Sequence, residues 1–251
     1  MKIKLLNRQS LKTLFAAGAR PKESNFFSLI DAMLNKVDDG ISKNEKDGLV
    51  LAPKGEDSNK VISFYDNVED ELPQWSVALG QNEDNDLSIE APITNTKAIT
   101  AISFKKSGAI GIGTKKPRTT LEVTGVLGAD TRIGTYKIGT ISADGHWHDI
   151  VTGLDGCIAF EVMAQVGKAK AGRYALLHAH ALSTFGKSHH KIRKTQAHYG
   201  WFWNKIDIRF TGSTYDYKLQ MRTKSDYGTG QNIQYHITKL WDTDISKLFK
   251  Q

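Results

Sequence analysis

The pattern of apolar residues changes near residue 40. In residues 24–40, SNFFSLIDAMLNKVDDG, apolar positions recur at spacings of four, three and four. These positions are Phe26, Ile30, Met33 and Val37. The spacing predicts an amphipathic helix that Ser24 or Asn25 caps and Gly40 ends. Two heptads are marginal in water, so we expect this stripe to be covered, either by the rest of the chain or by other copies in an oligomer.

After residue 40 the pattern becomes one of short apolar runs separated by polar turns, which is typical of strands. Five such runs precede residue 105, at 48–53, 61–66, 74–80, 87–92 and 98–104. They carry few large side chains and predict a thin β spacer that gains burial from neighbouring copies. From residue 136 the runs are richer in aromatic residues, and six to eight strands over this length predict a β-sandwich, jelly-roll-like in its path.

The sequence therefore predicts a mainly β chain in four parts. These are an N-terminal helical attachment and trimerisation segment (1–46), a β spacer (47–107), a glycine-rich β collar (108–135) and a C-terminal β-sandwich head (136–251). Residues 201–203, Trp-Phe-Trp, are expected in a strand, with Trp201 and Trp203 on one side and Phe202 on the other.

Composition narrows the class of protein. The 251 residues are 39% hydrophobic and 24% charged, and Cys157 is the single cysteine. No apolar run approaches the roughly 20 residues of a membrane span, and the N-terminus has no signal-peptide core, so we expect assembly in the cytoplasm and no membrane span. Residues 106–251 hold 21 basic and 11 acidic side chains, which suits an anionic partner or a solvated surface.

The glycine-rich stretch at 108–123, GAIGIGTKKPRTTLEV, resembles a phosphate-binding loop only superficially. Gly108 and Gly113 have the separation of that loop, but Thr114 and Lys115 follow in the reverse order. The next residues also read as a strand, whereas phosphate binding needs a helix start. We therefore expect no nucleotide cofactor here.

Histidines and carboxylates are the remaining candidates for chemistry. Two His-x-His pairs, His146 with His148 and His178 with His180, would each point two imidazoles to one face of a strand, and these four are the candidate metal ligands. Four carboxylates are available for glycan hydrolysis, namely Asp144, Asp149, Asp155 and Glu161. No nucleophile motif accompanies them, so we predict no catalytic residue, no cofactor and no enzymatic activity.

The segment 186–205 mixes basic and aromatic residues. Its candidate ligand contacts are Lys191, Arg193, Lys194, Tyr199, Trp201 and Trp203. Such a mixture can stack on sugar rings or bases and bind anionic groups. The alternative is a buried aromatic strand beside an exposed basic hairpin. A glycan or envelope ligand is preferred, and nucleic acid is not expected.

Residues 110–125, IGIGTKKPRTTLEVTG, resemble an Ile-Gly-Ile-Gly-Thr-x-x-Pro-x-x-x-Leu-x-Val-x-Gly element of tail-fibre and adhesin-like proteins of bacteriophages. Other stretches, from LLNRQSLKTLF to YGWFWNKIDIRFTG and YHITKLWD, are similar to small proteins of extracellular contractile injection systems, which are phage-tail-like particles. In such proteins the glycine-rich element is a turn and strand near the junction of a trimeric shaft with its head.

The resemblance implies a homotrimer on an extracellular particle or virion. Its N-terminus would attach to the baseplate or another particle protein, and its head would meet a cell-surface glycan or envelope receptor. Close approach of backbones near a threefold axis would explain Gly111 and Gly113, which we predict, with the heptad positions, at the oligomer interface. Two alternatives remain, a purely architectural subunit and a carbohydrate-active enzyme carried by the particle.

Overall fold

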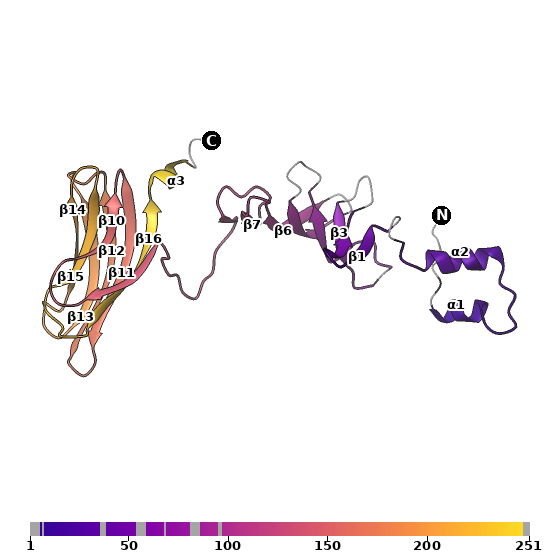
Figure 1. The fold of residues 1–251 in the computed structure, drawn as a ribbon, viewed down its shortest axis with the longest axis horizontal. Coiled ribbons are helices and arrows are strands. Elements are labelled where there is room, and N and C mark those ends of the chain that lie inside the picture. Colours follow the sequence, from indigo (N-terminus) through magenta and orange to yellow (C-terminus); the bar gives the residue numbers. More distant parts are fainter. Residues whose placement is uncertain are drawn as a thin grey trace. The chain divides into compact units, whose positions relative to one another are not determined.

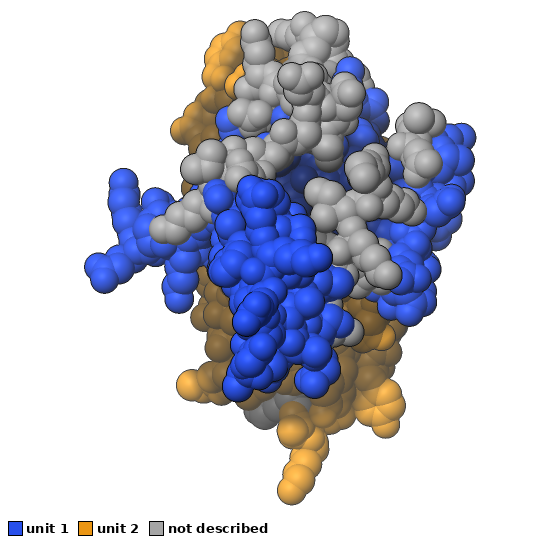
Figure 2. Space-filling model, turned by 90° about the vertical axis from the view of Figure 1, so that its right-hand side faces the viewer, with its two compact units in different colours: residues 1–127 blue, residues 128–251 orange. Residues whose placement is uncertain are grey.

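The computed structural model describes residues 6, 8–35, 39–53, 59–67, 69–80, 86–94 and 97–247. These residues form three helices and 16 strands, so the chain is mainly β, as the sequence predicts. The chain divides into two compact units, residues 1–127 and residues 128–251 (Figure 2). Within the described part of the chain, no helix is long and apolar enough to cross a membrane.

Two short helices open the first unit, α1 (Arg8–Leu14) and α2 (Glu23–Asp31). The rings of Phe15 and Phe26 meet edge to face, with centroids 5.3 Å apart. Neither helix has a buried residue, because this one contact covers little of their apolar surface.

The predicted helix over 24–40 is too long. It ends at Asp31, so Phe26 and Ile30 lie on α2, Met33 lies beyond its end, and Val37 is outside the described residues. The Asp39 carboxylate accepts a hydrogen bond of 2.6 Å from the Asn35 backbone N–H, which a continued helix would use itself.

The predicted caps also differ from those observed. Asn25 lies inside the first turn, and its side chain accepts a hydrogen bond from the Lys22 backbone N–H at 2.8 Å. Gly40 has the left-handed φ of 65°, but it precedes a strand instead of ending the helix.

A hairpin of β1 (Ile41–Asn44) and β2 (Gly48–Leu51) is followed by a six-stranded sheet (Figure 1). The strands of this sheet, in their spatial order, are β3 (Lys60–Phe64), β4 (Trp75–Leu79), β5 (Leu87–Pro92), β6 (Ala98–Phe104), β7 (Ile110–Ile112) and β8 (Leu121–Val123). All neighbours are antiparallel except β7 and β8, which are parallel. The strands predicted before residue 105 are thus confirmed, and the glycine-rich stretch extends the same sheet.

One face of the six-stranded sheet is apolar, and no described residue of the first unit buries its large side chains. The register places Phe64 opposite Trp75 and Leu87 opposite Phe104. Eight large side chains of this face are 36–58% exposed: Ile62, Phe64, Trp75, Leu87, Ile99, Phe104, Ile112 and Leu121. We call this surface the apolar face. A sheet normally buries such a face against a second layer.

The opposite face of the sheet is buried but carries small and polar side chains. They are Ser76, Ala78, Ser88, Glu90, Thr100 and Ser103. The connection 113–120 is anchored to this face: Ser103 Oγ donates to the Thr114 carbonyl at 2.7 Å, and Lys115 Nζ donates to the Glu90 carboxylate at 2.8 Å.

Glycine at positions 111 and 113 is required within the chain itself. A Cβ on Gly111 would lie 2.4 Å from the Thr114 carbonyl oxygen, and Gly113 has a φ of 71° with the Thr124 carbonyl oxygen 3.0 Å from its Cβ position. The glycine-rich stretch is thus a turn that folds back over its own sheet. Its place at an oligomer interface stays a prediction.

The second unit is a β-sandwich (Figure 1). A five-stranded sheet has the order β13-β12-β11-β16-β9, and a three-stranded sheet has the order β10-β15-β14. Their bounds are β9 (Lys137–Ser142), β10 (His148–Leu154), β11 (Ile158–Lys168), β12 (Arg173–Ser183), β13 (Lys191–Tyr199), β14 (Ile206–Gly212), β15 (Tyr217–Thr223) and β16 (Asn232–Trp241). A short helix, α3 (Thr243–Lys247), follows.

The inner faces of the two sheets share one hydrophobic core. Its largest side chains with less than 2% exposure include Phe160, Leu177, Tyr217, Leu219 and Tyr227. Strict alternation along β12 and β14 supplies this core from every second residue, as expected for strands with one solvated face.

Candidate functional site

An exposed aromatic turn joins β13 to β14. We call residues 199–205 the aromatic loop. Tyr199, Trp201 and Phe202 are 63–68% exposed, and Trp203 is 47% exposed. The rings of Trp201 and Trp203 stack at 5.9 Å with 9° between their planes. The expected strand over 201–203 is wrong, and the reading of these aromatics as core is wrong too, because they lie on the surface.

The backbone of the aromatic loop is held by a buried asparagine. Asn204 is 2% exposed, and its side-chain amide donates to the Tyr199 carbonyl at 3.0 Å. Ser225 Oγ donates to the Asn204 carbonyl oxygen at 3.3 Å. Gly200 has a φ of 87°, and a Cβ there would lie 2.5 Å from the Gly172 carbonyl oxygen. The exposed rings therefore stand on a backbone that is fixed before any ligand arrives.

The structure does not bring the predicted basic contacts to the aromatic loop. Lys191 begins β13 and Tyr199 ends it, so about 26 Å of strand separates them. Lys191 and Arg193 share the outer face of the five-stranded sheet with Leu182 and His180, whereas Lys194 lies on the other side in an ion pair with Asp207.

Two further basic residues meet at the end of the loop, Lys205 within it and Lys224 beside it, and the sequence did not predict that they pair. Lys205 ends the loop, and its carbonyl accepts a hydrogen bond of 2.8 Å from the backbone N–H of Lys224. Lys224 also forms an ion pair with Asp207 at 3.8 Å. The sequence gives no signal for this pairing, because it depends on the register of β14 against β15.

A second constellation lies on the outer face of the five-stranded sheet. We call Glu161 of β11 with His178 and His180 of β12 the histidine–carboxylate cluster. Register places Glu161 directly opposite His180, and the His178 Nε2 lies 2.9 Å from a Glu161 oxygen. The imidazole rings of the two histidines are 5.0 Å apart. This pair thus projects to one face, as predicted.

The other His-x-His pair is placed elsewhere. His148 begins β10 of the three-stranded sheet, and its Nε2 lies 2.8 Å from Asp144 Oδ1. His146 precedes the strand and is largely exposed, with its Nδ1 3.7 Å from the same oxygen. The structure therefore does not join the two pairs.

Arg132 forms an ion pair with Glu161 from the segment that precedes β9. This segment is fixed along β16, since the Gly134 N–H donates to His236 Nδ1 at 3.1 Å and the Tyr136 N–H donates to the Ile237 carbonyl. The hydrogen bond with His178, opposed by burial and helped by the charge of Arg132, lowers the pKa of Glu161.

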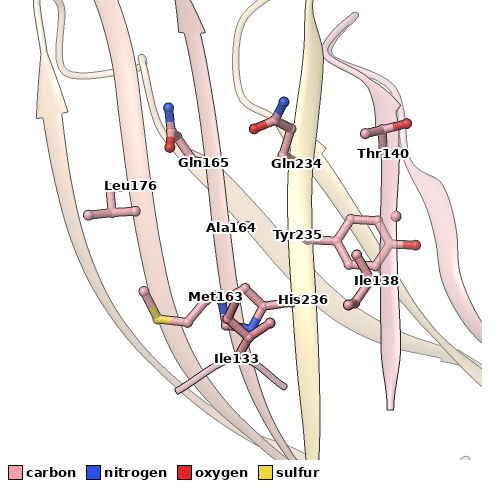
Figure 3. A pocket seen from close by; sticks show the side chains of 11 residues that line it. Ile133, Ile138, Thr140, Met163, Ala164, Gln165, Leu176, Gln234, Tyr235 and His236 are labelled. Carbon is pink, nitrogen blue, oxygen red and sulfur yellow. The ribbon is translucent and has the colours of Figure 1, made fainter. Parts of the chain in front are cut away.

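A mostly apolar hollow of about 560 Å³ adjoins the cluster on the same sheet face. Figure 3 shows Ile133, Met163 and His236 at one side of it, and Ile138 and Thr140 of β9 at the other. Met163 lies directly opposite His178 in the sheet, which connects the hollow to the cluster.

The candidate carboxylates have different hydrogen-bond partners. Asp144 is next to His148, and Asp149 accepts hydrogen bonds from Lys218 and Gln220. These hydrogen bonds lower the pKa of both aspartates. Asp155 lies in the turn between β10 and β11. Asp144, Asp149 and Glu161 are thus charged at neutral pH, whereas a general acid for glycoside hydrolysis needs a raised pKa.

Comparison with known proteins adds no relative. The chain matches no protein-family model, and it has no significant match among curated proteins. The features of the chain that bear on function are the apolar face, the aromatic loop and the histidine–carboxylate cluster.

Proposed function

We propose that the chain is a non-enzymatic structural and receptor-binding protein, a homotrimeric tail-fibre-like component of a phage-tail-like contractile particle. Its N-terminal segment attaches to the baseplate or another particle protein. Its C-terminal sandwich, jelly-roll-like in the path of its strands, is the head and contacts a cell-surface ligand. The protein assembles in the cytoplasm and acts on the extracellular particle.

The observation that carries this proposal is the apolar face of the six-stranded sheet. Within the described residues of the first unit, no second layer covers the large exposed side chains of this sheet, and such a layer normally stabilises a fold. Burial of such side chains is worth about 1.5–3 kcal/mol each, so the face favours association. Three copies that turn their apolar faces toward a common axis would supply the missing layer, and the resemblance of residues 110–125 to fibre elements favours three.

The N-terminal helices support the same proposal. Phe26 and Ile30 are 50% and 56% exposed although both are on α2. A nine-residue helix with an uncovered apolar stripe is marginal in water. Contacts with other copies, or with the particle protein that receives the N-terminus, would stabilise it.

The aromatic loop is the proposed receptor contact. Aromatic rings on a fixed backbone lose little entropy when they bind, and the exposed parts of the stacked Trp201 and Trp203 rings offer an apolar surface to a sugar ring. Lys205 and the neighbouring Lys224 add positive charge, which favours an anionic glycan or envelope component.

A glycan array probed with the full chain tests the receptor role. We expect binding to a subset of glycans, and loss of at least tenfold in affinity in the double variant Trp201→Ala/Trp203→Ala. Tyr215→Ala is the matched control, since Tyr215 is 71% exposed but lies outside the loop. Equal binding by both variants would refute the loop as the contact. Turnover of any bound glycan would favour the enzyme alternative.

A further inference from the structure

We propose that Glu161, His178 and His180 form a binding site for a divalent transition-metal ion, with Zn²⁺ as the best-suited ion. One nitrogen from each histidine and one carboxylate oxygen all lie within 4.8 Å of one another. A single chain supplies all three ligands, so the inference does not depend on the trimer.

The separations are close to those of a coordinated ion. Zinc bonds to imidazole nitrogen and carboxylate oxygen are about 2.0–2.2 Å long, which places neighbouring ligand atoms of a tetrahedral site about 3.3–3.6 Å apart. His178 Nε2 and the Glu161 oxygen are 2.9 Å apart in a hydrogen bond, so a small separation of the two side chains would admit an ion. Register fixes β11 against β12, so small side-chain rotations, chiefly of His180, suffice to bring the third ligand in.

Arg132 is the proposed positioning residue of this site. It binds Oε2 of Glu161, whereas His178 is next to Oε1, so one oxygen stays available to a metal ion. Hydrogen bonds from outer residues commonly orient ligating carboxylates in this way. The pairing of residues 134–136 with β16 holds Arg132 in reach.

The ligand set determines the class of ion. Two imidazoles and one carboxylate suit zinc and similar first-row ions, whereas calcium and magnesium prefer oxygen ligands alone. Three protein ligands leave a coordination position open, and His180 is exposed, so water would occupy that position.

The chain contains its own control. Asp144, His146 and His148 are the same kinds of residue, also in a His-x-His pair, but among the described residues only the Glu161 group has its ligand atoms gathered within 4.8 Å. His146 Nδ1 and Asp144 Oδ1 are 3.7 Å apart and His146 is mostly exposed. A site that depends on sheet geometry should therefore distinguish the two pairs.

Calorimetric titration of Zn²⁺ into the chelator-treated, untagged full chain tests the inference. We expect about one Zn²⁺ per chain, a higher thermal midpoint of unfolding with Zn²⁺, and at least tenfold weaker binding in His178→Ala/His180→Ala and in Glu161→Gln. The double variant His146→Ala/His148→Ala should keep the native affinity. Arg132→Gln should weaken binding several-fold while retaining one Zn²⁺ per chain.

Two results would overturn the inference. One is Zn²⁺ binding that survives His178→Ala/His180→Ala unchanged, and the other is equal loss of affinity in both double histidine variants. Circular dichroism of each variant without metal establishes folding, which matters most for the control variant, because His148 lies directly opposite the buried Met221. If His178→Ala/His180→Ala is unfolded, His178→Gln/His180→Gln replaces it, and the same two results would overturn the inference.

Discussion

The β-sandwich and the six-stranded sheet solve the burial problem in opposite ways. Among its described residues, the sandwich holds 23 buried hydrophobic residues in one core between its two sheets. In the described part of the first unit, Ala78 is the single buried hydrophobic residue, and the buried face of the sheet carries serine, threonine and glutamate instead. The large apolar residues of that sheet are on its exposed side. The sandwich thus buries its apolar residues within one chain, whereas the sheet exposes the apolar face that we propose is covered by other copies.

The two outer faces of the sandwich also differ, one being polar and the other partly apolar. The three-stranded sheet has a polar outer face in which Asp149 binds Lys218, and Arg209 and Arg222 pack on the ring of Trp147 at 4.1 and 4.4 Å. The five-stranded sheet instead presents the apolar hollow and the histidine–carboxylate cluster. Paired charges are typical of a face adapted to water, whereas an exposed apolar surface marks a site of interaction.

The largest effect is expected on assembly, from a charge introduced into the apolar face. Ile102→Asp places a charge at the centre of the apolar face, opposite Ile89 and Ile112. Burying an unpaired charge in an interface is prohibitive, so assembly should be lost while the sandwich stays folded. Light scattering after size exclusion measures the mass. Lys116→Asp, in the exposed part of the connection, is the control and should assemble normally. Assembly of Ile102→Asp like the native protein would contradict the account.

A cavity in the core of the sandwich should lower the stability of the second unit without disrupting assembly. Phe160 is fully buried, so Phe160→Ala should lower the free energy of unfolding of the second unit by about 3–5 kcal/mol. Leu176→Ala, on the outer face and 47% exposed, should cost less than about 1.5 kcal/mol. Denaturant unfolding followed by tryptophan fluorescence measures both. A similar cost for the two variants would show that the core is not where the structure places it.

Gly111→Ala should destabilise the first unit by about 1–3 kcal/mol, because its new methyl group overlaps the Thr114 carbonyl oxygen. Gly128→Ala is the matched control, since nothing lies within 4 Å of the Cβ position there. Thermal unfolding of the two variants distinguishes a steric requirement from a general cost of replacing glycine. Equal midpoints would remove the steric explanation.

The smallest predicted effect is a dependence on pH through Glu90. Burial disfavours its charged form, but hydrogen bonds from Lys115 and Ser88 outweigh burial, so the pKa of Glu90 lies below its usual 4.5. A group whose pKa is lowered by folding stabilises the fold above its unfolded pKa and loses that contribution as pH falls through the folded value. Stability of the first unit should therefore decrease below about pH 4.5.

Glu90→Gln should reduce that acid-dependent decrease, and the exposed Glu45→Gln should leave it unchanged. Thermal midpoints measured between pH 3 and pH 7, roughly the range over which carboxylates titrate, provide the comparison. An identical pH profile in Glu90→Gln and the native protein would show that Glu90 does not contribute.

Sequence patterns predicted the strands well, because the alternation of apolar and polar residues depends on which faces of a strand are buried and not on which strand pairs with it. The helix over 24–40 was less predictable. Its heptad spacing is real, but the Asp39 side chain accepts the Asn35 N–H, and Phe26, Ile30 and Met33 stay at least half exposed. The aromatic loop was also predicted wrongly as a strand. Its aromatic residues favour strands individually, but Gly200 and the buried Asn204 hold them in a turn.

The candidate site shows why pairing across strands limits such predictions. His178 and His180 were visible in the sequence as a pair, but Glu161 joins them only through the register of β11 against β12. A shift of one residue would turn Glu161 to the other face of the sheet. The positions of Lys205 and Lys224 beside the aromatic loop depend on register in the same way.

The central claim is that the apolar face is covered by other copies of the chain. Native mass spectrometry of the full protein tests it most directly. The account predicts a stable species of about 84 kDa, three times the chain mass of 27.9 kDa. A stable monomer of 27.9 kDa at micromolar concentration would contradict it.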